Sequence, residues 1–347
     1  MALLSLDPPI GEILVVNAGS TSLKLSIVDA VERSRPLAGL AEASGVGVVG
    51  HRIVHGGPLF VDPVVIDDGV VASLESLVEL APLHNAPAVD AIHAVQARLP
   101  GAVQVAVFDT AFHRTLPERA ATYPLPARFR ERGVRRYGFH GLSLEWAVTQ
   151  VAASRLVVCH LGGGSSVTAV LDGRSVDTSM GLTPLEGVPM TTRAGSIDPG
   201  ALLYLLRNGV SVDELEYAMV HESGLTGLAG TGDVAELERG PSPAAVLALD
   251  IFAYRVAQAI AAMAVALGGL DALVFTGGIG EHAAGVRAAV CARLGWLGVV
   301  VDQEANAELA GDGRIDARSA AVRVHVVRSH EDVVVARHVR AVLGSSL

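Results

Sequence analysis

One pattern of residues occurs twice in this chain, and it restricts the folds that the chain can adopt. LVVNAGSTSLKLSIVD (14–29) and LVVCHLGGGSSVTAVLD (156–172) each read as an apolar strand, a turn of small residues and a second strand in which apolar residues alternate. A third such turn follows the apolar run of DALVFTGGIGEHAAG (271–285) and opens a helix. The repetition favours two domains of related topology, each built around a strand, a turn and a strand.

The remaining elements complete an α/β pattern of alternating strands and helices. Ser329 and Asp332 have the spacing of a capping box for the last helix, and PLHNAP (82–87) reads as a loop bounded by prolines. The further strands are expected at 50–57, 102–109 and 322–327, and the helices at 70–80, 87–98, 142–153 and 331–343.

Composition excludes several classes of protein. The 347 residues suffice for two domains, and half of them are hydrophobic. The longest apolar stretch, VAQAIAAMAVALGGLDALVF (256–275), is interrupted by Gln258, two glycines and Asp271, so we expect a buried helix, a turn and a buried strand in place of a membrane span. The first residues lack the basic segment of a signal peptide, which predicts a cytoplasmic protein.

Charge and cysteine content point away from nucleic acid and disulfides. The formal net charge is −10, and the arginine-rich run ARFRERGVRRYGFHG (127–141) is interpreted as a solvated loop, with a nucleic-acid patch as the weaker alternative. Cys159 and Cys291 fit no metal-binding spacing, so both are expected to be reduced structural thiols.

Lys24 is the only lysine of the chain, and it lies just after the first small-residue turn. Glycine-rich turns at strand ends allow backbone N–H groups to approach phosphate oxygens. None of the turns matches the P-loop or the dinucleotide-binding pattern, and each alone is more often a plain turn. Together with Lys24, the three turns favour a nucleotide ligand.

Motifs spread along nearly the whole chain give the strongest signal. In order they are NAGSTSLKLSI (17–27), HRIVHGG (51–57), APLHNAP (81–87), VFDTAFHRTLP (107–117), RRYGFHG (135–141), CHLGGGSSV (159–167), VDTSMGLTPLEGVPMTTRAGSIDPG (176–200), FTGGIGEH (275–282) and the final helix with Glu331. The set resembles the acetate kinase family. This resemblance implies the fold of the actin-like ATPase superfamily, with two RNase H-like domains of duplicated βββαβαβα topology around a nucleotide cleft. The first domain would comprise residues 1–117 completed by 330–347, and the second residues 118–329.

The resemblance also implies a reaction, the reversible transfer of the ATP γ-phosphoryl group to the carboxylate of acetate. The acceptor is already ionised, so the difficulty is to bring two anions together, and arginine side chains suit that task. The family's two arginines fall on Arg52 and Arg193, its catalytic aspartate on Asp109, and its transition-state histidine on His140. Asp109 is expected to orient Arg52 or the attacking carboxylate, and His113 and His160 match further family histidines.

The other implied sites follow in the same way. Mg²⁺, or Mn²⁺ in its place, would be held by Asn17 and Glu331, partly through water. The apolar pocket for the methyl group of acetate falls on Val54, Leu83, Phe139 and Pro184. The ATP and ADP contacts fall on Lys24, His160, Leu161, Gly162, Gly163, Gly164, Asp233, Val234, Ala235, Gly278, Ile279, Gly280, Glu281 and His282. As in the family, a homodimer is expected, without nucleic acid or membrane partners.

Some residues depart from the family pattern. Gly163, Ala235 and His282 stand on the nucleotide side where the family has other residues, as do Ser196 and His330 nearby. Only residues 29–50 separate the first hairpin from GHRIVHGG, so part of the first domain is expected to be missing.

The alternatives that remain are a kinase for propionate, an acyl kinase that uses pyrophosphate, a weakly active ATP-binding paralogue, and an ATP-hydrolysing protein of the actin or heat-shock type. The set of Arg52, Asp109, His140 and Arg193 argues against the last of these, because hydrolysis needs no carboxylate clamp.

Overall fold

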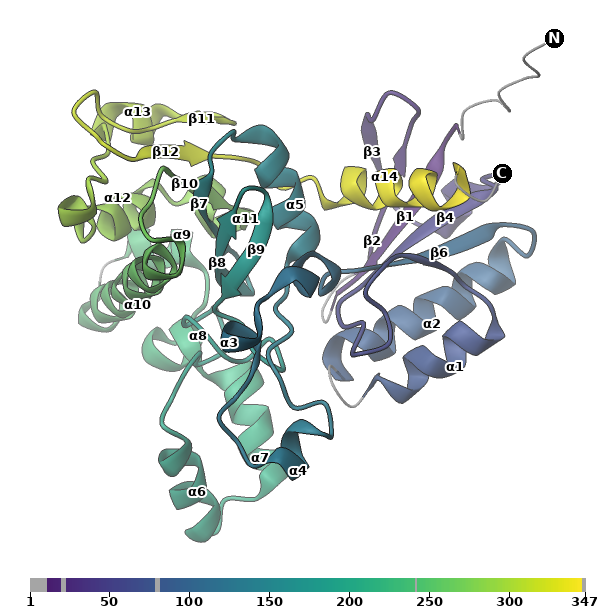
Figure 1. The fold of residues 1–347 in the computed structure, drawn as a ribbon, viewed down its shortest axis with the longest axis horizontal. Coiled ribbons are helices and arrows are strands. Elements are labelled where there is room, and N and C mark those ends of the chain that lie inside the picture. Colours follow the sequence, from purple (N-terminus) through teal and green to yellow (C-terminus); the bar gives the residue numbers. More distant parts are fainter. Residues whose placement is uncertain (1–10, 20–22, 79–81, 241, 345–347) are drawn as a thin grey trace. The chain divides into compact units, whose positions relative to one another are not determined.

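The structure is a computed structural model that describes residues 11–19, 23–78, 82–240 and 242–344, without the side chains of 82–84. The turn residues 20–22 and the side chain of Leu83 therefore lie outside the described part. The chain forms two compact units (Figure 1). Unit 1 contains residues 1–111 and 330–347, and unit 2 contains residues 112–329.

Unit 1 is built on a six-stranded mixed sheet with the order β3-β2-β1-β4-β6-β5. The first three strands form an antiparallel meander, in which Asn17 of β1 lies opposite Lys24 of β2. Strands β1, β4 and β6 are parallel, so their carboxyl ends meet at one edge of the sheet. The strands are β1 (Ile13–Ala18), β2 (Leu23–Val28), β3 (Ser34–Leu37), β4 (Val48–Ile53), β5 (Val64–Val65) and β6 (Val103–Phe108).

Helices cover both faces of this sheet (Figure 1). α1 and α2 enclose an apolar core with alternate residues of β1, β4 and β6. α14 packs on the other face, where a Cβ atom at Gly50 would lie 2.5 Å from Val335 Cγ1, so glycine is required for the close approach of the helix. The helices of unit 1 are η1 (Leu40–Ala43), α1 (Asp68–Ser76), α2 (Pro82–Arg98) and α14 (Glu331–Gly344).

Unit 2 repeats the same topology. Its sheet has the order β11-β12-β10-β7-β8-β9, with an antiparallel meander β7-β8-β9, parallel strands β7, β10 and β12, and an antiparallel edge strand β11. The sequence likeness of the two hairpins therefore reflects a likeness of complete sheets. The strands are β7 (Arg155–Leu161), β8 (Ser165–Leu171), β9 (Arg174–Thr178), β10 (Ala272–Thr276), β11 (Gly313–Arg314) and β12 (Arg323–Val326).

Two cores flank the second sheet. α10 and α12 bury one face, and α5 buries the other against Leu156, Val158, Ala272 and Val274. The helices are η3 (Ala111–Thr115), which bridges the unit boundary in sequence, α3 (Glu118–Ala121), α4 (Ala127–Arg130), α5 (Gly141–Gln150), α6 (Pro199–Arg207), α7 (Val212–Tyr217), η4 (Ala218–Glu222), α8 (Gly224–Ala229), α9 (Val234–Arg239), α10 (Pro243–Leu267), α11 (Gly277–His282), α12 (Ala284–Ala292), η5 (Gly295–Leu297) and α13 (Gln303–Glu308).

Two local predictions are wrong. PLHNAP is not a loop, because α2 begins at Pro82 and contains Pro87. Proline is accepted in the first turn of a helix, where N–H groups have no intrahelical partner, and this explains Pro82. The capping box is absent as well: the Ser329 hydroxyl donates to Ser143, and the Asp332 carboxylate accepts from the hydroxyls of Ser26 and Ser34.

α10 is a long helix that is rich in apolar residues. Within the described residues it is the single helix long and apolar enough to cross a membrane, by length and composition only. The predicted helix, turn and strand are confirmed: α10 ends at Gly268, which caps it with φ of 67°, and β10 follows. Ten of its residues are buried, among them Phe252, Val256 and Ile260, which belong to the core of unit 2.

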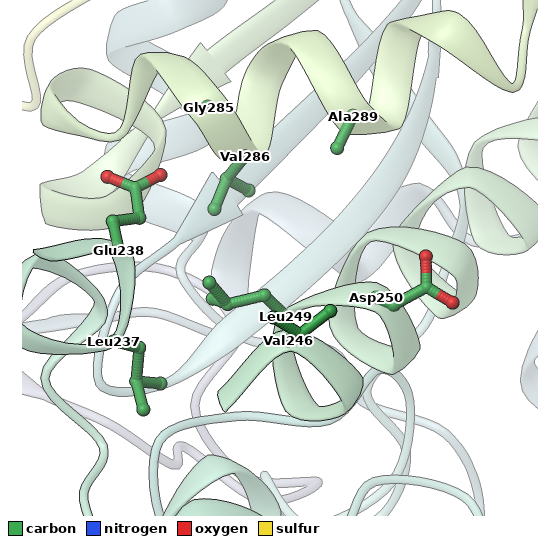
Figure 2. A pocket seen from close by; sticks show the side chains of 8 residues that line it. All are labelled: Leu237, Glu238, Val246, Leu249, Asp250, Gly285, Val286 and Ala289. Carbon is green, nitrogen blue, oxygen red and sulfur yellow. The ribbon is translucent and has the colours of Figure 1, made fainter. Parts of the chain in front are cut away.

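A groove opens beside α10 on the surface of unit 2 (Figure 2). α9, α10 and α12 supply its walls, and the side chains of Glu238 and Asp250 flank its apolar lining. The lining residues are Leu237, Glu238, Val246, Leu249, Asp250, Gly285, Val286 and Ala289.

Candidate active site

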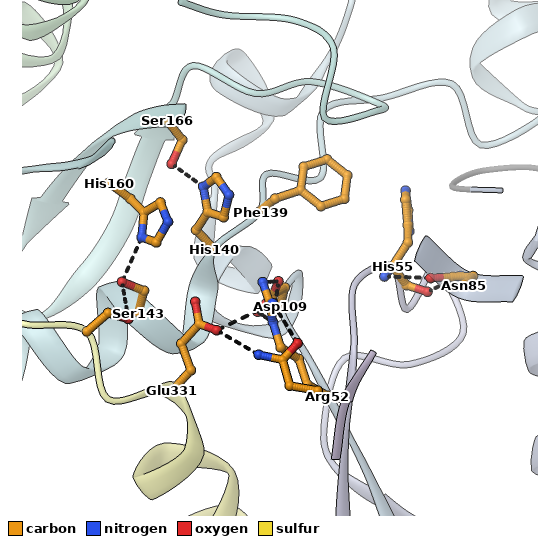
Figure 3. Close-up of polar contacts among 12 residues, drawn as sticks. Arg52, His55, Asn85, Asp109, Phe139, His140, Ser143, His160, Ser166 and Glu331 are labelled. Carbon is orange, nitrogen blue, oxygen red and sulfur yellow. Dashed lines mark hydrogen bonds and ion pairs between the residues drawn. The ribbon is translucent and has the colours of Figure 1, made fainter. Parts of the chain in front are cut away.

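An ionic cluster occupies the carboxyl edge of the sheet in unit 1. Arg52, the second-last residue of β4, donates from Nε and Nη2 to the carboxylate of Asp109, at 3.1 Å and 2.5 Å to Oδ2 (Figure 3). Asp109 follows β6 and is fully buried. Burial alone would lower the pKa of Arg52, but the carboxylates of Asp109 and Glu331 raise it above the ordinary value. The guanidinium is therefore permanently charged and held in a fixed plane.

Asn17 and Glu331 complete this cluster from β1 and the start of α14. Asn17 Oδ1 accepts from Arg52 Nη1 at 3.0 Å, and Asn17 Nδ2 donates to Glu331 Oε2 at 3.3 Å. Glu331 Oε2 lies 3.4 Å from Arg52 Nη1. Lys24 is exposed on the neighbouring strand, in register with Asn17. The structure thus brings Asn17, Arg52, Asp109 and Glu331 together.

The residues expected to form the acid pocket are distributed over both units. Val54 is buried one residue beyond β4, and Leu83 lies in the first turn of α2. Phe139 is buried just before α5, and Pro184 is buried in the loop after β9. Asn85, which the sequence does not single out, fixes the backbone next to Val54. Its side chain accepts from the N–H of His55 and donates to the carbonyl oxygen of His55.

Two stacked imidazoles lie at the corresponding edge of the sheet in unit 2 (Figure 3). The rings of His140 and His160 have centroids 4.0 Å apart and planes 20° apart. His140 Nδ1 lies 2.9 Å from Ser166 Oγ, and His160 Nδ1 lies 2.8 Å from Ser143 Oγ. His140 also has a left-handed backbone, with φ of 61° and ψ of 22°, immediately before α5. Such a conformation costs a non-glycine residue about 1–2 kcal/mol and is found where surrounding structure imposes it, often at functional sites.

The Nε2 atoms of both rings face the glycine turns. A Cβ atom at Gly164 would lie 3.1 Å from His140 Nε2 and 3.5 Å from Arg193 Nη1. A Cβ atom at Gly277 would lie 3.1 Å from His160 Nε2. Two imidazoles and a guanidinium thus surround turns that carry no side chains. We call this set, Gly162–Gly164 with Gly277, His140, His160 and Arg193, the glycine cradle.

Arg193 reaches the glycine cradle from a loop in which it is half-buried. Its Nη1 donates to the carbonyl oxygen of Pro184 at 3.3 Å. Burial lowers the pKa of Arg193, but an arginine stays charged in proteins. A charge held in a desolvated position interacts more strongly with an anion than the same charge in water.

The predicted nucleotide segments differ in their exposure. Gly163, Asp233, Ala235, Gly278 and His282 are exposed, and Asp233 caps α9 by accepting from the N–H groups of Ala235 and Glu236. Others point inward: Leu161 and Val234 belong to the core, Gly280 is buried, and Ile279 packs against the core. Glu281 also has internal partners, since its Oε1 accepts from the N–H groups of Gly277 and Ser329.

His113 supports the backbone beside His140. Its Nε2 donates to the carbonyl oxygen of Phe139 at 3.0 Å, and its Nδ1 accepts from Ser175 Oγ at 2.8 Å. Burial lowers its pKa to about 4, so the ring is neutral at physiological pH. A Cβ atom at Gly138 would lie 2.7 Å from this ring, and φ of 76° there also requires glycine.

Sequence reasoning misses a second supporting group, which holds the loop of Pro184. Glu186 accepts from Arg136 Nη2 at 2.8 Å and from the hydroxyl of Tyr123. Arg136 Nη1 also donates to three successive carbonyl oxygens, those of residues 178–180. These residues lie in motifs that the sequence analysis quotes, but no spacing rule connects them.

The chain is similar to known proteins over most of its length. A family model described as the Acetokinase family matches residues 40–337. The chain is 47% identical over 304 residues to an acetate kinase of Rhodopseudomonas palustris (strain TIE-1), an alignment that covers 85% of this chain and 76% of the relative.

Two solved structures are similar along nearly their whole length. A propionate kinase from Francisella tularensis superposes with a TM-score of 0.88 at 34% identity, covering 94% of this chain and 98% of that chain. An acetate kinase from Porphyromonas gingivalis gives 0.83 at 31% identity, covering 96% and 100%.

Proposed function

Since the chain belongs to the Acetokinase family, we propose that it catalyses the reversible reaction of ATP and acetate to ADP and acetyl phosphate. A carboxylate oxygen of acetate forms a bond to the γ-phosphorus, and the bond from that phosphorus to the oxygen bridging to the β-phosphorus breaks. The electron pair of the broken bond leaves with ADP. No proton has to move, because acetate is ionised at neutral pH.

The observation that carries this proposal is the glycine cradle. His140 Nε2, His160 Nε2 and Arg193 Nη1 gather around glycine turns without side chains. Phosphoryl transfer spreads charge over three equatorial oxygens, and stabilising this charge with fixed donors is the main task of the protein. We propose that His140 and Arg193 donate to these oxygens and that His160 contacts the phosphates of the nucleotide.

In unit 1, Arg52 is proposed to bind the carboxylate of the acid. Asp109 holds the guanidinium in one plane through Nε and Nη2. A bidentate Arg–carboxylate contact gives both charge and orientation, which an ammonium group cannot give. Val54, Leu83, Phe139 and Pro184 are proposed to surround the methyl group, and Lys24 to contact ATP.

Asn17 and Glu331 fit a magnesium ion by their chemistry. They offer an amide oxygen and a carboxylate, which lie side by side and are linked by a hydrogen bond of 3.3 Å. Mg²⁺ is commonly held by one or two carboxylates together with waters and substrate phosphates. Among the described residues, no group of three or more His, Cys, Asp or Glu side chains could hold a metal ion. Held by Asn17 and Glu331 together with ATP, the ion would neutralise negative charge of the phosphates.

We assign the base of the nucleotide to the groove of Figure 2. The groove lies between α9, which follows Asp233, and α12, which follows the GGIGEH segment, so two of the expected nucleotide segments adjoin it. Its lining is largely apolar, as suits a flat heteroaromatic ring. The carboxylate of Glu238 can accept from an exocyclic amine.

A coupled assay tests the proposed function. Purified protein is incubated with Mg-ATP, acetate and hydroxylamine, which traps acetyl phosphate as a hydroxamate. We expect hydroxamate only when both ATP and acetate are present. ADP release without acetate would identify an ATPase, and product from pyrophosphate in place of ATP would identify a different donor.

Propionate is the second candidate acceptor. The solved structure with the TM-score of 0.88 is named a propionate kinase, and this makes propionate an acceptor to test here as well. The hydroxylamine assay run with both acids gives the preference as the ratio of the two kcat/KM values.

We further propose a cytoplasmic homodimer. α6 and α7 expose large apolar side chains, including Leu203, Tyr204, Val212 and Tyr217. Such a patch is more typical of an interface than of a free surface. Cys159 and Cys291 are buried free thiols, as expected in a reducing compartment. Sedimentation of the wild type and of a Tyr204→Glu variant tests the dimer.

A further inference from the structure

His160 is held by a chain of hydroxyl groups that the sequence does not reveal. Its side chain points to the face of the sheet covered by α5, together with Val158 and Thr276. There Nδ1 lies 2.8 Å from Ser143 Oγ, in the first turn of α5 (Figure 3). Ser143 Oγ in turn accepts from the hydroxyl of Ser329 at 3.2 Å.

The direction of these bonds determines where the imidazole carries its proton. A serine hydroxyl has one proton to donate. Because Ser143 accepts from Ser329, its own proton is available for the second contact, which is with His160 Nδ1. If that proton is donated to Nδ1, a neutral ring carries its own proton on Nε2.

We infer that Ser143 and Ser329 are positioning residues that hold His160 in the Nε2–H tautomer, so that it donates to an oxygen of the phosphoryl donor. The inference rests on the proposed function only for the identity of that ligand. Nε2 faces Gly277 and Gly162, whose Cβ atoms would lie 3.1 Å and 3.8 Å away. The other tautomer would present a lone pair to an anion, which is repulsive.

One carboxylate oxygen anchors both ends of this arrangement. Glu281 Oε1 accepts from the N–H of Ser329 at 3.0 Å, which fixes the start of the hydroxyl chain. The same atom accepts from the N–H of Gly277 at 3.0 Å, which fixes the glycine that faces Nε2. Glu281 therefore fixes the position of Ser329, which starts the hydroxyl chain, relative to that of Gly277, which faces the imidazole.

His113 provides an internal control in the same unit. Its Nε2 donates to a carbonyl oxygen, which can only accept, so its tautomer is fixed by a different contact. Neither of its partners, Ser175 and Phe139, belongs to the chain from Ser329 to His160. Changes in Ser143 should leave His113 as it is.

Nitrogen NMR of histidine-labelled protein without substrate tests the inference. The chain has 12 histidines, and a His160→Asn variant assigns the signal of His160. In the wild type we expect a protonated Nε2 and an unprotonated Nδ1. In Ser143→Ala the Nδ1 signal should move, because it loses its donor, while the His113 signals stay unchanged. A wild-type His160 protonated at Nδ1 would overturn the inference, as would a spectrum that Ser143→Ala does not alter.

Kinetics supply the second measurement. Ser143→Ala should lower kcat/KM for ATP by roughly 2- to 10-fold, the scale of one neutral hydrogen bond. Ser329→Ala keeps the Ser143 hydroxyl but removes the donor to its oxygen, so the hydroxyl proton is less strongly directed to His160. This variant should give a smaller loss. The matched control is Thr149→Ala, which removes an exposed hydroxyl from the same helix and should change neither measurement. Equal losses in Ser143→Ala and Thr149→Ala would contradict the inference.

The two proposals can fail separately. The NMR signature needs no substrate, whereas the hydroxylamine assay needs no knowledge of the tautomer. The expected wild-type tautomer without trapped acetyl phosphate would refute the proposed function alone. Trapped product from a wild type with a protonated Nδ1 would refute the inference alone.

Discussion

The two sheets of this molecule have the same strand order but opposite chemistry at their carboxyl edges. Asn17 pairs with Arg52 across β1 and β4, and at the corresponding register His160 pairs with Thr276 across β7 and β10. In unit 1 this edge carries an ionic network around Arg52. In unit 2 it carries imidazoles and hydroxyls, and the charged Arg193 comes from a loop.

Under the proposed function, this difference lets one topology support two tasks. An acid that must be held in place needs a permanent opposite charge, which in turn needs counter-ions such as Asp109 while the site is empty. Under the proposed function, a phosphoryl group in transit is stabilised by fixed directional donors, here the two imidazoles together with the guanidinium of Arg193. A fixed ion network is also costly to break, whereas each neutral hydrogen bond contributes about 1 kcal/mol. Substitutions in unit 1 should therefore affect stability more, and those in unit 2 catalysis.

The largest effect is expected for Arg193→Ala, which removes the guanidinium of the glycine cradle. If Arg193 stabilises the migrating phosphoryl group, kcat should fall roughly 10³-fold, the scale of losses at arginine fingers. The unfolding free energy should change little, because burial lowers the pKa of Arg193 and so already disfavours its charge in the folded protein. Steady-state kinetics and urea unfolding measure the two effects.

Arg193→Lys is the matched control for this prediction. It keeps the charge but not the planar fork, so it should restore little of the rate. A near-normal kcat in Arg193→Ala would remove the residue from the mechanism, and a full recovery in Arg193→Lys would show that charge alone suffices.

Asp109→Asn should have the next largest effect, and mainly on stability. It leaves Arg52 without its buried counter-ion, which typically costs about 3 kcal/mol. Ser166→Ala in unit 2 is the comparison, since it deletes one neutral bond to His140 and should cost about 1 kcal/mol. Urea unfolding of both variants measures the difference. Equal losses would mean that the contrast between the two edges has no energetic consequence.

The fold was largely predictable because most of its strands and turns are marked by patterns within short segments of the sequence. The alternation of LKLSIV, the glycine turns and the apolar runs correctly predict β1, β2, β7, β8, β10 and β12. The PLHNAP segment fails because proline reads as a breaker, although the first turn of a helix accepts it. The short connection 29–50 still contains β3, which completes the meander, so the sheet of unit 1 keeps its full strand order.

The candidate site was predictable only where a motif carries a recognisable residue. Arg52, Asp109, His140 and Arg193 lie in such motifs, and the structure brings Arg52 and Asp109 into contact. Glu281 was expected to contact ATP, but its bond to Ser329, like the bond from Ser329 to Ser143, joins segments far apart in sequence, which no periodicity encodes. The unit boundary has the same cause: contacts group residues 112–117 with unit 2, where His113 bonds to Ser175, while the sequence analysis sets the division after 117.

Acid should weaken both units in part through buried histidines, His51 in unit 1 and His113 in unit 2. Burial lowers the pKa of His51 in unit 1 and of His113 in unit 2 from 6.5 to about 4. The unfolded chain takes up these protons as the pH falls below about 6.5, and the folded protein does so only near 4, so stability decreases across that window. Each histidine should contribute about 2 kcal/mol of this loss between pH 7 and pH 5.

Urea unfolding at both pH values tests this prediction. His51→Gln removes the titrating group of unit 1 but keeps a side chain that can bond to Gln104. The loss between pH 7 and pH 5 should be about 2 kcal/mol smaller in this variant than in the wild type. An unchanged loss would show that carboxylates, and not His51, set the acid sensitivity of unit 1.

The smallest effect concerns acid length, which we expect Val54 of unit 1 to limit. Val54 is buried two residues after Arg52, so trimming it with Val54→Ala should make room for one more methylene next to the proposed carboxylate site. A methylene in such a pocket changes kcat/KM by roughly 10-fold or more. The ratio of kcat/KM for propionate to that for acetate should therefore rise by about this factor, at little cost in kcat for acetate.

Val49→Ala is the matched control. Val49 is also buried and lies in β4, five residues before Val54, but its side chain belongs to the core beneath α2. It should lower stability and leave the ratio unchanged. If both variants shift the ratio alike, Val54 is a core residue, and acid length is set by Phe139 or Pro184 of unit 2 instead.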